Sequence, residues 1–139
     1  MLTLQDERLR FIAEAALYAA IAWLFHQSLG ILLDTPMPVV AVVSNSMEPI
    51  LYKGDLLLVA GGDVKVRDIA VYQLNTGRQT VTIVHRIIGV TDHGYVFKGD
   101  NNKVPDPGFV RKDQIIGTVH IAMPLLGYPR TLLFDLVGI

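Results

Sequence analysis

The chain has 139 residues, a formal net charge of −1 and no cysteine. This length accommodates one domain and a membrane anchor. The nearly balanced charge gives no electrostatic footprint for nucleic acid, and the lack of cysteine excludes disulfides, thiolate catalysis and Cys-ligated zinc. Hydrophobic residues make up 51% of the chain and the mean hydropathy is +0.41, as expected if one segment lies in lipid.

Residues 1–35 predict an N-terminal transmembrane anchor. Residues 15–33 form a segment of 19 residues without a formal charge, and a helix of this length is about 28 Å long, close to a hydrocarbon core of about 30 Å. A signal peptide is one alternative, but its apolar core would be shorter and a small-residue cleavage site would follow. A buried amphipathic helix is the other alternative.

The charges that flank this segment predict its orientation. Arg8 and Arg10 precede it, and no Lys or Arg follows it before Lys53. The positive-inside rule therefore places the N-terminus in the cytoplasm and the rest of the chain outside it, at a cell membrane or an endoplasmic-reticulum membrane.

Residues 36–124 predict a mainly β domain. Short apolar or alternating runs are separated by Gly-, Asn- and Asp-containing turns, which favours a compact, coiled antiparallel sheet or a barrel-like sheet. The strands are expected at residues 39–43, 56–59, 69–74, 80–90, 95–97 and 115–121.

Residues 125–139 form an apolar tail that contains Pro129, Arg130 and Asp135. Its 15 residues are too few and too charged to predict a membrane span. Two interpretations stay open, an interfacial helix and a truncated second span.

Two serines follow the first expected strand. Ser44 and Ser46 lie two residues apart just outside the anchor, where a nucleophile and its neighbour could face a membrane-borne substrate. Because a serine is inert at neutral pH without a base, the rest of the chain must supply one.

His85 is the strongest candidate for that base. In the alternating strand 80–90 it shares a face with Ile83 and Ile87, and an apolar face favours the neutral imidazole that can accept a proton. The turn-rich segment that follows offers Asp100 and Asp106 to orient this imidazole. Taken singly, a lone histidine is more often a core residue, and such carboxylates more often shape a loop. The four histidines contain no HExxH motif or close pair, so no metal site or other cofactor is expected.

Together these motifs resemble the type I signal peptidases. Residues 44–49 look like the S-x-S-M-x-P nucleophile box, and residues 53–59 resemble the Gly-Asp strand that follows it. Residues 84–88 look like the base box, and residues 98–102 with Asp106 resemble the G-D-N box and its downstream aspartate. The base box carries His85 where the commonest bacterial branch has lysine, so the resemblance is to the archaeal and endoplasmic-reticulum type.

The resemblance implies a role for each residue. Ser46 would be the nucleophile, Ser44 an oxyanion-hole donor and His85 the general base. Asp106 is the preferred partner of His85 and Asp100 a supporting carboxylate, although the sequence leaves open which of the two contacts the imidazole. Alignment to the boxes suggests apolar substrate-pocket residues, for which core packing is an equally good explanation: Val42, Met47, Leu51, Ile83 and Val84.

The resemblance also implies a function. The protein would be a membrane-bound serine endopeptidase that removes N-terminal signal peptides from preproteins and cleaves after small residues in an A-x-A pattern. Its partners would be signal peptides, the lipid bilayer and additional subunits of unknown identity. Two alternatives are a Ser–Lys self-cleaving protease of the same fold and a non-catalytic membrane-anchored subunit. The presence of Ser46, His85, Asp100 and Asp106 speaks against the second.

Overall fold

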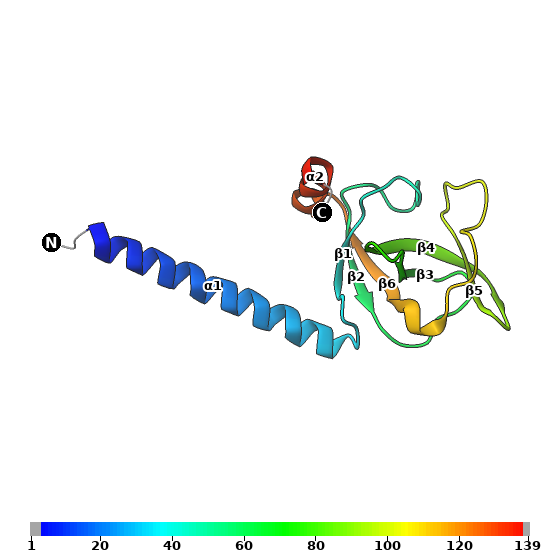
Figure 1. Ribbon diagram of the computed structural model, residues 1–139, viewed down its shortest axis with the longest axis horizontal. Helices are drawn as coiled ribbons and strands as arrows, with labels where there is room; N and C mark the ends of the chain where they lie inside the picture. The colour runs from blue at the N-terminus through cyan, green and yellow to red at the C-terminus, as the bar shows by residue number, and fades with distance from the viewer. Residues whose placement is uncertain (1–3, 138–139) are drawn as a thin grey trace.

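The computed structural model describes residues 4–137 and combines one long helix with a six-stranded sheet (Figure 1). The strands predicted from the sequence are all present, each with slightly different ends. The elements are α1 (Leu4–Leu32), β1 (Val39–Ala41), β2 (Leu56–Ala60), β3 (Ile69–Asn75), β4 (Thr80–Thr91), β5 (Gly94–Lys98), the 3-10 turn η1 (Lys112–Gln114), β6 (Ile115–Met123) and α2 (Tyr128–Val137).

The helix α1 extends away from the sheet (Figure 1). None of its apolar window is buried against the rest of the protein, and it is the one helix among residues 4–137 that is long and apolar enough to cross a membrane. Large side chains such as Phe11 and Trp23 are exposed along it. A buried amphipathic helix is therefore excluded, and apolar side chains of this kind fit a lipid environment.

The sheet is antiparallel, with the strand order β1-β2-β6-β3-β4-β5. The prediction of a mainly β antiparallel domain is confirmed. The barrel-like alternative is wrong, because no ladder joins the two edge strands β1 and β5 within the described residues. Barrel closure requires such a ladder, and these strands have only three and five residues.

Two apolar clusters support the sheet. The first is formed by β1, β2, β3 and the chain that follows β1, and the second is formed mainly by β3, β4 and β5. The first cluster contains Val40, Val42, Met47, Leu51, Leu57, Val59 and Val71, and the second contains Ala70, Tyr72, Ile87, Phe97 and Val110. The two serines and His85 are therefore attached to tightly packed parts of the domain.

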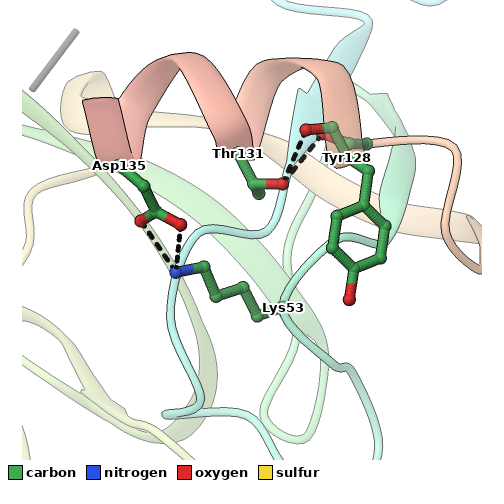
Figure 2. Close-up of polar contacts among 5 residues, drawn as sticks. Lys53, Tyr128, Thr131 and Asp135 are labelled. Atoms are coloured by element: carbon green, nitrogen blue, oxygen red, sulfur yellow. Dashed lines mark hydrogen bonds and ion pairs between the residues drawn. The ribbon is translucent and has the colours of Figure 1, made fainter. Parts of the chain in front are cut away.

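The tail forms the helix α2, which docks on the loop before β2. The Gly127 N–H donates to the carbonyl of Gly54 at 2.9 Å, and Lys53 Nζ lies 2.8 Å from both carboxylate oxygens of Asp135 (Figure 2). The buried Thr131 hydroxyl donates to the Tyr128 carbonyl at 2.9 Å. The ten residues of α2 extend for about 15 Å, half a hydrocarbon core, so the described part of the tail forms no second span.

Candidate active site

Ser46 lies on a turn that is fixed from two sides. Met47 is 1% exposed and fills the first apolar cluster, while its carbonyl accepts the Ile50 and Leu51 N–H groups at 3.0 Å. From the loop after β5, the Asn101 N–H donates to the Ser46 carbonyl at 2.8 Å. A Cβ on Gly99 would come within 2.6 Å of that same carbonyl oxygen, so the close approach of the two loops requires glycine. These contacts fix the backbone of Ser46, which carries the hydroxyl.

His85 reaches this hydroxyl from β4. Its strand partner is Ala70 on β3, whose small side chain leaves room for the imidazole. The residue is 8% exposed, and its Nε2 lies 2.9 Å from the Ser46 Oγ. The sequence-based prediction that His85 occupies a buried face is confirmed.

Asp106 lies on the opposite side of the imidazole. Its Oδ2 is 2.5 Å from His85 Nδ1, and its backbone N–H donates to the Phe97 carbonyl at 2.8 Å. An Nδ1–H tautomer fits both contacts of His85, because it donates to Asp106 and leaves Nε2 free to accept the Ser46 proton. A serine, a base and an acid that orients the base are the three parts of a hydrolytic triad.

Asp100 has a different partner. Arg86 Nε donates to its Oδ1 at 2.8 Å, and Arg86 Nη2 donates to its Oδ2 at 2.6 Å. This pairing with Arg86 holds the pKa of Asp100 below its ordinary value, against the opposing effect of burial. Of the two candidate carboxylates, the structure brings Asp106 to the imidazole and uses Asp100 to fasten the adjacent loop to β4.

Ser44 lies next to the nucleophile candidate. Its Oγ is 3.1 Å from the Ser46 Oγ. Within residues 4–137, the Ser46 N–H donates to no acceptor. A hydroxyl and a backbone N–H that are both available beside a serine Oγ are suited to stabilise an oxyanion.

The predicted pocket residues divide into two groups. Val42, Met47 and Leu51 are 5%, 1% and 3% exposed and belong to the first apolar cluster, whereas Ile83 and Val84 are half-buried. Core packing accounts for the first three, and contact with a substrate stays a prediction for all five.

Two residues at the site were not singled out from the sequence. The Tyr72 hydroxyl donates to the Oδ2 of Asp106 at 2.7 Å, and Arg86 holds Asp100 as described. Tyr72 follows three apolar residues, a pattern that indicates no polar role, and only the β3–β4 register places it near His85. No group of three His, Asp or Glu side chains in residues 4–137 is arranged to hold a metal ion.

Comparison with known proteins decides the family. The chain matches no protein-family model. It is 34% identical over 139 residues to a signal peptidase complex catalytic subunit from Pyrenophora tritici-repentis, which covers 89% of this chain and 79% of the relative. It is 33% identical over 148 residues to the catalytic subunit SEC11 of Scheffersomyces stipitis, which covers 96% of this chain and 87% of the relative. The chain belongs to the signal peptidase family.

Within that family the chain is of the SEC11 type, as the histidine in its base box suggests. This signal peptidase is a serine hydrolase, and its exposed apolar helix α1 fits membrane anchoring. The resemblance inferred from four short motifs is confirmed by similarity along most of the chain.

Proposed function

We propose that Ser46, His85 and Asp106 are the catalytic triad with which this signal peptidase removes signal peptides from preproteins. The observation that carries the proposal is the chain of contacts from Ser46 Oγ through both nitrogens of His85 to Asp106, at 2.9 and 2.5 Å. His85 takes the Ser46 proton as the hydroxyl attacks the scissile carbonyl, and then gives that proton to the leaving amine. Asp106 keeps the imidazole oriented and stabilises its protonated form.

The oxyanion of the tetrahedral intermediate is bound next to Ser46. The Ser46 N–H is one donor and the Ser44 hydroxyl is the other. Support for this assignment comes from the 3.1 Å separation of the two hydroxyl oxygens and from the unused N–H. An oxyanion donor of this kind typically lowers the barrier by about 3 kcal/mol.

An extended substrate has two backbone edges available beside the triad. The strand β1 pairs only with β2, and β5 pairs with β4 only from Arg86 onward, so the outer edge of residues 80–85 is left without a strand partner in the described residues. Val84 packs against the first apolar cluster, which also contains Val40 of β1. A peptide that adds as a strand here would place its side chains near Val84 and this apolar cluster. This favours cleavage after small residues, in an A-x-A pattern.

In this proposal the anchor tethers the triad close to the membrane surface. With the N-terminus cytoplasmic, six linker residues connect the end of α1 to β1 on the other side of the bilayer. A catalytic domain tethered in this way encounters membrane-bound signal peptides at a high effective concentration. The relatives are catalytic subunits of a complex, and we propose that this chain also assembles with further subunits at its membrane.

The decisive experiment compares purified variants on one substrate. Wild type, Ser46→Ala, His85→Ala and Asp106→Asn are prepared in detergent and given a preprotein with an A-x-A site. Wild type is expected to release the signal peptide, and Ser46→Ala and His85→Ala to release none. Asp106→Asn should lower kcat by about 10³- to 10⁴-fold, because the imidazole loses its preferred tautomer.

Mass spectrometry of the mature N-terminus identifies the bond that is cut. The triad assignment fails if Ser46→Ala cleaves as fast as wild type. The specificity proposal fails if replacing both small residues of the A-x-A site with large ones leaves the rate unchanged.

A further inference from the structure

Tyr72 contributes a buried hydroxyl to the site, and the proposed triad assigns no role to this hydroxyl. The residue is 1% exposed, and its ring contacts that of Phe97 with the centroids 4.5 Å apart. A tyrosine this deep in a core needs a partner for its hydroxyl. That partner is Asp106, whose Oδ2 accepts from it at 2.7 Å.

The register of the sheet explains how the two residues meet. Tyr72 lies opposite Ile83, and Ala70 lies opposite His85. Residues that lie opposite each other on two strands share a face, as do alternate residues along one strand. Tyr72 is therefore the diagonal neighbour of His85 on the same face. The two rings approach Asp106 from adjacent strands and donate to the same carboxylate oxygen.

We propose that Tyr72 is a positioning residue of this signal peptidase: its hydroxyl fixes the Asp106 carboxylate and moderates how strongly that carboxylate holds the protonated His85. The inference rests on the proposed triad and extends it by a fourth residue. With only one donor, the carboxylate could rotate about its own bond. With two donors on Oδ2 and its backbone N–H tied to Phe97, its orientation is set.

The hydroxyl remains a donor throughout the working pH range. Burial raises the pKa of Tyr72 well above its ordinary value, and the hydrogen bond to Asp106 raises it further. The phenol therefore stays protonated, and its hydrogen bond stabilises the charge of the Asp106 carboxylate. A hydrogen bond to an ionised carboxylate stabilises its charge and so makes it a weaker acceptor for a second donor.

Few other charged groups face this cluster. Asp100 is close enough to His85 to interact with its charge, but it is paired with Arg86. Lys98 interacts with Asp100 from the end of β5. The Ser46 hydroxyl, which does not titrate in this range, is the remaining polar contact of the imidazole. Neither charged residue is altered by a substitution at Tyr72.

The test is Tyr72→Phe, which keeps the ring and removes only the hydroxyl. We expect kcat on the preprotein to fall about 10- to 100-fold, as for loss of a hydrogen bond to a charged group, with little change in KM. The acidic limb of the kcat/KM profile should move to higher pH, because the carboxylate released from Tyr72 holds the imidazolium more tightly. Loss of packing alone would not move that limb.

Tyr95→Phe is the matched control. Tyr95 packs against the same apolar cluster from β5 and is half-buried, so the substitution removes a hydroxyl from the same core without touching Asp106. It should leave kcat and the pH profile unchanged. Thermal unfolding of each variant in detergent separates loss of fold from loss of positioning.

Two further measurements separate this inference from the proposed triad. In an Asp106→Ala background, Tyr72→Phe should have no additional effect on the cleavage rate, because the carboxylate through which Tyr72 acts is absent. The downfield proton resonance of His85 Nδ1–H should shift in Tyr72→Phe, and this readout needs no catalysis. An unchanged resonance and an unchanged pH profile would overturn the role of Tyr72 even if Ser46→Ala is inactive. Failure of the triad itself would appear separately, as cleavage by Ser46→Ala at the wild-type rate, and would overturn both proposals whatever the resonance does.

Discussion

Arg86 holds Asp100 in a two-point ion pair, with Nε 2.8 Å from Oδ1 and Nη2 2.6 Å from Oδ2. The two side chains are 28% and 20% exposed. Arg86 also donates from Nη1 to the Arg67 carbonyl at 2.8 Å. The pair therefore joins the loop after β5 to β4, the strand that carries His85. The same loop carries Asn101, whose N–H binds the Ser46 carbonyl.

The first prediction concerns the pH dependence of this pair. The pKa of Asp100 is lower in the folded protein than in the unfolded chain, chiefly because of the hydrogen bonds from Arg86. Its ionised form thus contributes stability that is complete above about pH 4 and is lost as the pH falls through the folded pKa. Asp100→Asn should lower the free energy of unfolding at pH 7 by about 1 to 2 kcal/mol, less than for a fully buried pair. The difference in the free energy of unfolding between Asp100→Asn and wild type should become smaller at acidic pH.

Thermal unfolding in detergent at pH 7 and pH 3 measures this effect. Asp113→Asn is the control, because Asp113 also accepts two hydrogen bonds from an arginine, Arg111, but is well exposed. Its midpoint should hardly change at either pH. Equal midpoints for wild type and Asp100→Asn at pH 7 would contradict the prediction.

The second prediction concerns the Ser44 hydroxyl. Ser44→Ala should lower kcat by about 10²- to 10³-fold, with KM nearly constant, because an oxyanion donor acts mainly on the transition state. Ser44→Thr keeps a hydroxyl at the same position and should retain most of the activity. Initial rates on a saturating preprotein and on a dilute one separate kcat from KM. A rise in KM alone would show that Ser44 binds the substrate and does not stabilise the oxyanion.

The order of the elements could be predicted from the sequence because each strand carries its own local signal. The alternation from residue 80 to residue 90 correctly placed His85 on a buried face. The strand order in the sheet, with β1 and β5 at its open edges, could not be predicted, since it depends on pairings such as that of β2 with β6, which join segments far apart in the chain. The same limit applies to the acid: Asp100 and Asp106 lie on one loop, and only the fold decides which one faces the imidazole.

Tyr72 illustrates a different limit. The three residues before it, 69–71, are apolar, so the local pattern predicts a core residue, and Tyr72 does belong to the core. Its hydrogen bond to Asp106 requires a cross-strand register and a loop that returns 34 residues later. A single sequence contains both residues but no signal that links them.

The third prediction concerns the docking of α2. A Cβ on Gly127 would lie 2.7 Å from the Asp55 carbonyl oxygen and 3.0 Å from that of Gly54. Because both neighbours are backbone atoms, Gly127→Ala should push α2 away from the loop and destabilise the protein by about 1 to 3 kcal/mol. Trypsin cleavage after Arg130, which precedes the buried Thr131, should become faster.

Gly89→Ala serves as the control for that substitution. Its Cβ would meet only the Val96 Cβ at 3.9 Å, an ordinary contact. Mass spectrometry of the tryptic fragments reports the rate at Arg130, and thermal unfolding reports stability. If Gly127→Ala and Gly89→Ala give the same cleavage rate at Arg130, the close backbone approach does not hold α2 in place.

The fourth prediction concerns the apolar surface of α2. Its outer side chains are exposed, at 56% for Leu132, 55% for Leu133 and 80% for Leu136. The helix contacts β1, and β1 follows the end of α1 after six residues, a stretch that spans at most about 20 Å. We therefore expect α2 to lie in the membrane interface, with these side chains about 5 to 10 Å into the boundary between headgroups and acyl chains.

Fluorescence quenching in vesicles tests the fourth prediction. Trp23 is the only tryptophan of the chain, so Leu136→Trp is introduced into a Trp23→Phe background and the protein is reconstituted with brominated phosphatidylcholine. The new tryptophan should be blue-shifted and strongly quenched by the brominated lipid. A tryptophan introduced by Val104→Trp, at a position that is 69% exposed on the loop between Asp100 and Asp106, should be quenched by aqueous acrylamide instead. If both positions respond equally to the two quenchers, α2 does not lie in the interface.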